Sequence, residues 1–292
     1  MKISLSVLGL ALLAFFSASA QVSVEVILDQ NQFLPNESVP AEVRITNLSG
    51  QTLHLGADPG WLTFDVESED GFIVVKNADV PDMGAFDVAS SQVAVKRVDL
   101  QPYFDMTRRG RYQVVATLRI KDWGAEVSSP EKDFDVINGT KLWSQDFGLP
   151  MPPGVTNQAP EVREYTLEEA NYLSSELRLY VQVSDETESH VFKVFSIGGL
   201  VSFSHPETQL DRYSDLHVLW QDGASTFAYV VVSPDGSIVH REVYDYLPVV
   251  ARPRLSVDAN GDIVVVGGVR RVKPGELPDV IAPDQLAAPS GH

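Results

Sequence analysis

The stretch RYQVVATLRI, residues 111–120, decides the fold class. Every second residue is apolar, from Tyr112 to Ile120, and most residues between them are polar or charged. A period of two places alternate side chains on opposite faces of a strand, whereas an amphipathic helix has a period of about 3.6. The stretch is therefore predicted to form a β-strand that buries one face.

The same alternation recurs through the first part of the chain, at residues 22–28, 41–46 and 62–67. Turn-forming residues separate the runs at 47–50, 58–60, 69–71 and 108–110. Short alternating strands with frequent turns are typical of antiparallel sheets packed face to face. We therefore expect an all-β protein in which residues 21–140 form an antiparallel β-sandwich.

The segment FDMTRRGRYQVVATL, residues 104–118, places Gly110 two positions before Tyr112 at the start of this strand. The spacing resembles the tyrosine corner of immunoglobulin-like sandwiches, which implies that the Tyr112 phenol bonds to the upstream backbone. The runs VRITNLSGQTLHL and WLTFDVESEDGFIV also resemble bacterial extracellular immunoglobulin-like domains, including the intracellular proteinase inhibitor type. This resemblance implies an immunoglobulin-like β-sandwich and assigns no inhibitory residue.

Residues 161–272 contain an internal repeat. HPETQLDRYSDLHVLW, residues 205–220, aligns with RPRLSVDANGDIVVVG, residues 252–267, at a constant offset of 47. Repeats of about 40 residues with several short strands suit propeller blades, and the tract resembles the blades of sialidase-like β-propellers. Because a closed ring needs at least about four blades, we expect a smaller, open, blade-like β-sheet domain.

One helical signal interrupts this pattern. Thr166 and Glu169 have the spacing of a capping box, and the apolar residues Ala170 and Leu173 follow. A capping box satisfies two N–H groups at the start of a helix. A helix of two to three turns is therefore predicted at the entrance to the second domain.

Three segments are expected to lie outside the two domains. The opening MKISLSVLGLALLAFFSASA has a positive residue, an apolar run and a small-residue cleavage signal, which predict a signal peptide over residues 1–20. Prolines and glycines crowd residues 148–160, so we expect a linker at 141–160. The proline-containing residues 273–292 are expected to be a disordered tail.

The composition of the chain disfavours some classes of partner. The chain has no cysteine and a formal net charge of −18 at pH 7. Such a field repels nucleic acid and anionic lipid, and no run after residue 20 is long and apolar enough to span a bilayer. We expect an exported protein, periplasmic or extracellular, with neither a nucleic-acid partner nor a membrane span in the mature chain.

The motif DANGD, residues 258–262, raises a choice between a calcium site and a turn. Asp258, Asn260 and Asp262 match the first ligand positions of a calcium loop, but Ile263 and Val269 stand where such a loop needs glycine and glutamate. Asn-Gly between two apolar runs is a strong hairpin signal. We predict a turn, and no metal site or cofactor.

The sequence does not contain the common metal-binding and catalytic motifs that we considered. His190, His205, His217 and His240 have neither HxH nor HxxxH spacing, and neither a G-x-S-x-G elbow nor a phosphate-binding glycine loop occurs. Arg108, Arg109 and Arg111 form the densest cationic cluster. They are the candidate partner-binding residues, and a solvated turn beside a strand is the alternative.

These observations favour a non-enzymatic, exported binding or interaction protein. Its expected ligand is a protein or polysaccharide surface. Two alternatives stay open from the sequence. One is a secreted glycosidase-type enzyme whose repeats belong to an oligomeric propeller, and the other is a secreted protease inhibitor.

Overall fold

A computed structural model describes residues 21–81, 84–149 and 161–272. These residues form β-strands and one short 3-10 helix, η2 (Lys121–Trp123), so the all-β fold class is confirmed. Within the described ranges, no helix has the length and apolarity that crossing a membrane requires. The expected signal peptide, the expected tail and residues 150–160 of the expected linker lie outside the described residues.

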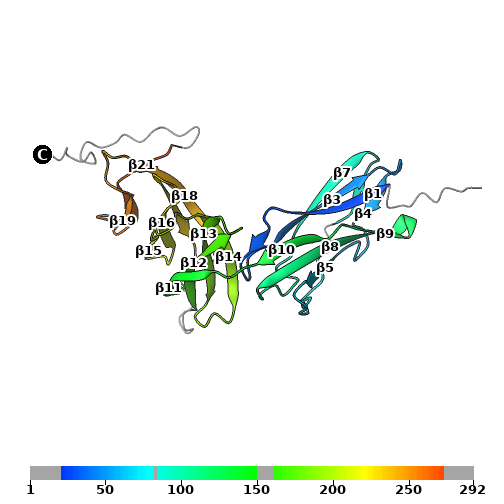
Figure 1. The fold of residues 1–292 in the computed structure, drawn as a ribbon, viewed down its shortest axis with the longest axis horizontal. Coiled ribbons are helices and arrows are strands. Elements are labelled where there is room, and N and C mark those ends of the chain that lie inside the picture. Colours follow the sequence, from blue (N-terminus) through cyan, green and yellow to red (C-terminus); the bar gives the residue numbers. More distant parts are fainter. Residues whose placement is uncertain (1–20, 82–83, 150–160, 273–292) are drawn as a thin grey trace, which may run out of the picture. The chain divides into compact units, whose positions relative to one another are not determined.

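The first ten strands make three sheets. One has the order β1-β3-β7, another β2-β10-β8-β5 with β9 also pairing β8, and β4 pairs β6 (Figure 1). Their bounds are β1 (Val22–Leu28), β2 (Gln32–Phe33), β3 (Pro40–Asn47), β4 (Leu53–Leu55), β5 (Leu62–Ser68), β6 (Phe86–Val88), β7 (Gln92–Asp99), β8 (Gly110–Ile120), β9 (Ala125–Ser128) and β10 (Lys132–Val136).

The predicted alternation determines which side chains these strands bury. In β8, the five apolar residues that begin at Tyr112 and end at Ile120 are all buried. β5 lies antiparallel to β8, with Phe64 opposite Ala116, and it buries Leu62, Phe64 and Val66. The strands predicted at residues 22–28, 41–46, 62–67 and 111–120 are therefore confirmed.

The remaining strands form three further sheets, of order β11-β12-β13-β14, β15-β16-β17-β18-β21 and β19-β20. Their bounds are β11 (Thr140–Gly148), β12 (Val162–Tyr172), β13 (Glu176–Asp185), β14 (Val191–Gly199), β15 (Glu207–Leu210), β16 (Leu216–Gln221), β17 (Thr226–Val232), β18 (Ile238–Asp245), β19 (Arg254–Val257), β20 (Ile263–Val266) and β21 (Val269–Arg270).

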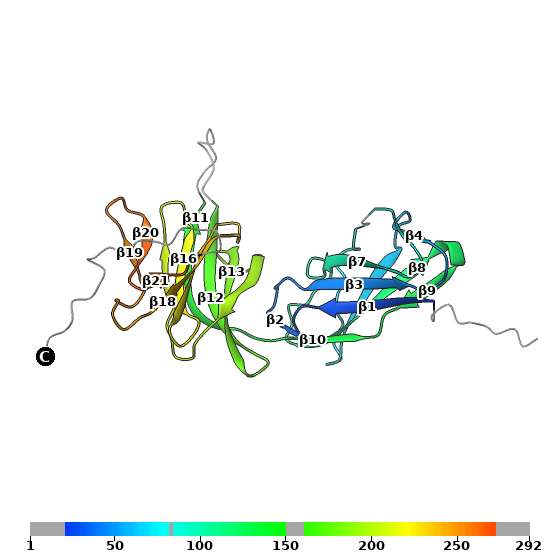
Figure 2. The same cartoon turned by 90° about the horizontal axis from the view of Figure 1, so that it is seen from above.

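These three sheets stack in layers. Side chains of β12, β13, β16 and β17, with Trp220 and Tyr165 the largest, pack in one core between the first two sheets. The other face of β16, β17 and β18 packs on Leu255, Ile263 and Val265 of the β19–β20 hairpin, which Figure 2 shows beside β16 and β18. Burial on both faces explains why β16 and β17 are almost continuously apolar.

The chain divides into two compact units. Of the described residues, the first unit contains 21–29, Pro40–Phe104 and Tyr112–Asp133, and the second contains Gln30–Val39, Asp105–Arg111 and those from Phe134 to Val272. The first part of the expected linker, residues 141–148, lies in strand β11, which pairs with β12. The chain therefore enters the sheets of the second unit earlier than its proline content indicates.

The predicted helix at Thr166–Leu173 is wrong. Residues 162–172 form strand β12, which pairs antiparallel with β11 on one side and β13 on the other. Thr166 and Leu167 are fully buried there. A capping box is a weak local preference, and pairing along both edges of a central strand outweighs it.

The internal repeat corresponds to two hairpins. β15 and β16 pair antiparallel through a turn that begins at Asp211, and β19 and β20 pair in the same way through a turn that begins at Asp258. The strands that correspond in this way are offset by the 47 residues that separate the two copies in the sequence. The repeat is therefore a repeat of structure.

Candidate binding groove

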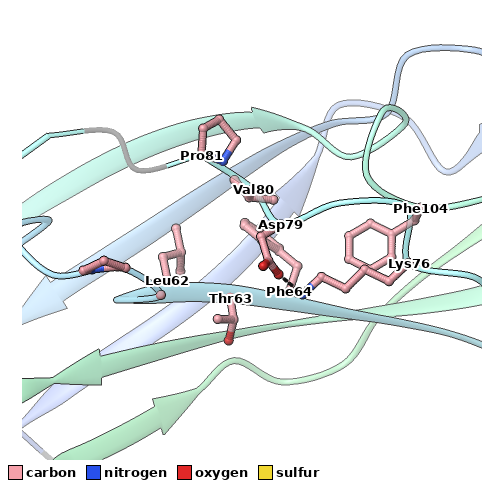
Figure 3. A pocket seen from close by; sticks show the side chains of 10 residues that line it. Leu62, Thr63, Phe64, Lys76, Asp79, Val80, Pro81 and Phe104 are labelled. Carbon is pink, nitrogen blue, oxygen red and sulfur yellow. Dashed lines mark ion pairs between the residues drawn. The ribbon is translucent and has the colours of Figure 1, made fainter.

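β5 is the last strand of its sheet within the described residues, bonded to β8 on one side, and a hollow of about 330 Å³ lies along its other side (Figure 3). Figure 3 shows Leu62 and Thr63 of β5 pointing to opposite sides of the strand, with Val80 and Pro81 across the hollow. The hollow is lined by Pro59, Gly60, Leu62, Thr63, Phe64, Lys76, Asp79, Val80, Pro81 and Phe104.

A second hollow, of about 440 Å³, continues along the same strand. It shares Lys76 and Phe104 with the first hollow. Its lining residues are Asp65, Val66, Glu67, Ser68, Gly71, Phe72, Ile73, Val74, Lys76 and Phe104. The two hollows therefore follow β5 from end to end, and we call them together the β5 groove.

The β5 groove has apolar walls. Phe64 and Phe104 are 1% and 4% exposed and form part of the buried core beneath it. Phe72, which also lines the groove, packs edge-on against the buried Tyr112 with ring centres 5.5 Å apart. Ile73 is 90% exposed at the groove, so its apolar side chain is accessible from solvent there.

Charged groups lie at defined places on the groove. Lys76 Nζ is 2.7 Å from Asp79 Oδ1, and Figure 3 shows this ion pair beside Phe104. Asp65 and Glu67 are exposed on β5. Their neighbours on β8 are Val115 and Gln113, neither of which carries a charge. The β5 side of the groove is therefore acidic.

A further hollow of about 290 Å³ lies near Trp61, and acids accompany its cationic side chains. Lys121 pairs with Asp58, and His54 Nδ1 is 2.7 Å from Asp87 Oδ1. The hydrogen bond that His54 donates to Asp87 raises the pKa of His54. These charges are already compensated, so this hollow lacks the one-sided charge of the β5 groove.

The DANGD motif forms a turn, as predicted. The backbone N–H of Asp258 donates to the Asp262 carbonyl oxygen at 2.9 Å, and the N–H of Gly261 donates to the Asp258 carbonyl oxygen at 3.1 Å. Asp258 Oδ1 accepts the N–H groups of Asn260 at 2.8 Å and Asp262 at 2.9 Å, which lowers the pKa of Asp258. Gly261 has φ +85°, a conformation that glycine adopts without strain.

The corresponding turn at Asp211 has the same geometry with different residues. Asp211 Oδ1 accepts the N–H groups of Tyr213 at 2.8 Å and Asp215 at 2.9 Å, and Ser214 takes the positive φ of 66°. Tyr213 and Ser214 replace Asn260 and Gly261. Because the hydrogen-bond pattern survives this replacement, the leading aspartate is explained by its bonds to the turn backbone.

Two of the four histidines meet in a polar cluster that their sequence spacing does not reveal. His217 on β16 has a side chain only 9% exposed, and its Nδ1 is 2.7 Å from the Tyr229 hydroxyl on β17. Its Nε2 lies 3.6 Å from Asp211 Oδ2. Burial lowers the pKa of His217 and raises the pKa of Tyr229 to about 12.

The cluster continues onto β18. His240 packs edge-on against Tyr229 with ring centres 5.9 Å apart, and His240 Nε2 is 3.1 Å from Glu242 Oε1. The Tyr244 hydroxyl donates to Glu242 Oε2 at 2.6 Å, and Arg270 lies 3.5 Å from Glu242. Antiparallel pairing of β16, β17 and β18 brings together these residues, which lie far apart in the sequence.

The predicted partner-binding arginines lie before and at the start of β8. Arg108, Arg109 and Arg111 are all exposed. Arg111 Nε is 3.7 Å from Asp135 Oδ1. None of the three lines the β5 groove. Their role in binding stays a prediction.

Sequence reasoning missed the β5 groove. It assigned β5 as an amphipathic strand, but strand order decides whether a strand lies at a sheet edge, and alternation alone does not reveal strand order. Two features of the sequence point to this region. One is the apolar run Phe72–Val75 directly after the turn at residues 69–71, and the other is the pair of acids Asp65 and Glu67 on the solvent side of β5. Neither signal indicates a groove until the sheet is assembled.

No family model and no curated protein matches the chain. Among solved structures, the sporulation control protein Spo0M of Bacillus subtilis is similar over 61% of this chain and 91% of its own chain. The identity is 11% and the TM-score is 0.29. A likeness of this size carries no argument about function.

Proposed function

We propose that this protein is an exported, non-enzymatic binding protein that holds a protein partner in the β5 groove. The observation that carries the proposal is a groove that follows one edge strand from Leu62 to Ser68. Hollows of about 330 and 440 Å³ fall in the usual size range of ligand sites. Apolar walls with a few charged groups suit a protein segment better than a polysaccharide.

The chemistry of the groove supports binding over catalysis. No histidine is among the residues that line the two hollows, and histidine is the most frequent general acid or base. The ion pair between Lys76 and Asp79 satisfies two of the charged side chains. What remains is an apolar surface beside a strand edge, which can hold a partner without transforming it.

The finer fold assignments belong to the same proposal. We infer an immunoglobulin-like arrangement for the first sheets, supported by the complete burial of Tyr112 near the start of β8. We infer a blade-like arrangement for the second unit, supported by the matched hairpins β15–β16 and β19–β20. Both arrangements are common in exported binding modules.

The test blocks the groove from each wall. Val80→Trp and Thr63→Trp each enlarge a side chain of a residue that lines the first hollow, and neither removes a buried core residue. Purified protein is screened against a random linear peptide library and a glycan array. We expect peptides that bind the wild type and lose at least about tenfold in affinity with either variant, since overpacking excludes a ligand from a filled site.

Val93→Trp is the matched control, because Val93 lies on β7, is 53% exposed and does not line the groove. Unfolding midpoints of all three variants show whether each is folded. Peptides that bind both blocked variants as well as the wild type would refute the proposal. A ligand set made up of glycans alone would refute it too.

A further inference from the structure

We propose that the partner enters the β5 groove as an extended strand, with apolar residues alternating with lysine or arginine, and adds to the β5 edge. This inference rests on the proposed function, since it specifies the partner of the same groove. It is carried by the backbone register of β5, by the face on which each side chain lies and by the charges of that strand.

The register shows which backbone groups face the groove. Arg119 donates its N–H to the Trp61 carbonyl oxygen at 2.8 Å, one step beyond the pair Leu62–Leu118. In an antiparallel ladder, residues that bond to the partner strand alternate with residues whose N–H and C=O groups point away from it. Leu62, Phe64 and Val66 therefore direct their backbone groups away from β8, towards the groove.

The outward-directed N–H and C=O groups of β5 can form hydrogen bonds with one more strand. The outward-directed residues are spaced by two, as strand pairing requires. Strand addition to an open sheet edge is a recurrent mode of peptide recognition, in which main-chain bonds supply affinity and alternate side chains supply specificity. A polysaccharide has no backbone amides and could not continue the ladder.

The side chains of β5 specify the apolar half of the partner. Leu62, Phe64 and Val66 are 5%, 1% and 7% exposed and lie on the core side of the sheet. A residue placed opposite any of them in an added strand has its side chain on the same face. Apolar partner residues at these positions would extend the existing core towards Phe104, which lines both hollows.

The other face of β5 specifies the charged half. Asp65 and Glu67 are exposed and have Val115 and Gln113 as neighbours on β8. Neither carboxylate is joined in an ion pair among the residues that the structure describes. Opposite charges directly across two strands are favourable, so the matching partner positions favour lysine or arginine. The net charge of −18 attracts such a segment at longer range.

The same charges disfavour the chain's own segments as occupants. A second copy of β5 would place Asp65 and Glu67 near their own counterparts, and like charges across two strands are destabilising. The residues from Lys273 to His292 contain four prolines and three acids, without an alternation of apolar and basic residues. A separate polypeptide of basic, alternating sequence is the occupant that fits.

The test uses synthetic seven-residue peptides and purified protein, with affinity measured by calorimetry. The reference peptide alternates valine with lysine. Comparison peptides alternate valine with glutamate, or hold the valines and lysines in two blocks. We expect the reference peptide to bind at least about tenfold more tightly than either comparison peptide, because only it satisfies both faces of β5.

Two further peptides test the ladder itself. One carries N-methyl groups on its valines and the other on its lysines. Only one of these sets can donate to β5, because alternate N–H groups of a strand point in opposite directions. We expect one peptide to lose binding and the other to retain it. Equal affinity of both would overturn strand addition.

Charge reversal tests the partner chemistry on the protein. The double variant Asp65→Lys, Glu67→Lys should prefer the valine–glutamate peptide, which reverses the wild-type order. The control Glu131→Lys, Asp133→Lys changes the net charge equally at exposed residues outside the groove and should keep the wild-type order. An unchanged preference after reversal at β5 would overturn the inference.

The two proposals fail differently. Suppose that peptides bind the wild type whatever their alternation, charge and N-methylation, and that Val80→Trp abolishes this binding. That result would keep the groove as the binding site and refute strand addition. Peptides that bind in the predicted order but are unaffected by Val80→Trp and Thr63→Trp would refute the groove itself. Self-association of the wild type that the reference peptide competes away would assign the edge to a second copy and refute the basic partner.

Discussion

Asp258 binds the backbone of its own turn through a single carboxylate oxygen, Oδ1. Asp211 makes the same two bonds in a turn that contains a tyrosine and a serine instead of Asn260 and Gly261. The hydrogen-bond pattern therefore belongs to this type of hairpin turn and does not depend on the residues inside it. The backbone bonds lower the pKa of Asp258, so it stays ionised in ordinary buffers and keeps accepting them. The aspartate therefore has a structural role that needs no ion.

Asp258→Ala is expected to lower the unfolding midpoint by about 1–3 °C, because the turn loses two acceptor contacts at an exposed site. Calcium should leave the midpoints of wild type and variant unchanged. Scanning calorimetry with and without calcium makes the comparison. A calcium-dependent rise in the wild-type midpoint that disappears in the variant would identify an ion site instead.

His217 should make stability depend on pH. Its folded-state pKa is lowered, mainly by burial, below the unfolded value of 6.5, and Asp211, Tyr229 and His240 face it. Between the two pKa values the unfolded chain binds more protons than the folded one, so its stability must fall as the pH falls. The stabilising contribution is complete above 6.5 and is lost on acidification through that window.

The expected result is a drop in the free energy of unfolding from pH 7.5 to pH 5 that is smaller in His217→Gln than in the wild type. His205→Gln, at an exposed histidine, is the control and should follow the wild type. An NMR titration of the His217 ring should have its midpoint below 6.5. A midpoint above that value would show that the attraction of Asp211 outweighs burial.

At the scale of elements, β12 shows where sequence reasoning fails. Its capping box is a real local preference, but residues 164–167 are buried on both faces of a strand that is paired along both edges. A helix there would lose both sets of ladder bonds. The strands with one polar face, such as β1 and β8, were predictable because burial on one side leaves a period-two pattern.

Leu167→Ala is expected to cost about 2–5 kcal/mol, the usual range for a fully buried leucine in a packed core. Asn171→Ala, at an exposed position of the same strand, should cost less than about 0.5 kcal/mol. Urea unfolding of both variants gives the comparison. Similar losses at the two positions would contradict the strand register.

The β5 groove could not be predicted at this scale, because it depends on strand order. The sequence indicates that Leu62, Phe64 and Val66 are buried, and the structure agrees. That their backbone groups face an open side follows only once β5 is seen at the end of its sheet. The candidate site therefore depends on the assembled sheet: its β5 side belongs to a predicted strand, whereas residues 72–81 and Phe104, which complete it, belong to no predicted strand or turn.

At the scale of the whole molecule, the net charge bears on the proposed partner. The net charge of −18 favours basic segments over acidic ones before any contact is made. Salt screens such long-range attraction over about 10 Å at an ionic strength of about 0.1 M. Main-chain hydrogen bonds and apolar burial in the groove are less sensitive to salt.

Binding of the valine–lysine peptide should therefore weaken on raising the salt concentration from about 0.05 M to about 0.5 M, mostly through a slower association rate. The Asp65→Lys, Glu67→Lys variant should show a smaller salt effect with the same peptide. Stopped-flow association kinetics measure both. An association rate that does not change with salt would show that charge attraction does not contribute to association of the peptide.

Backbone amide hydrogen exchange, followed by NMR at each residue of β5, tests the central claim most directly. In the free protein we expect slow exchange at Thr63, Asp65 and Glu67, which bond to β8, and faster exchange at Leu62, Phe64 and Val66. With the valine–lysine peptide bound, the second set should become slow while the first stays unchanged. Exchange at Leu62, Phe64 and Val66 that is unaffected by a saturating peptide would contradict strand addition at this edge.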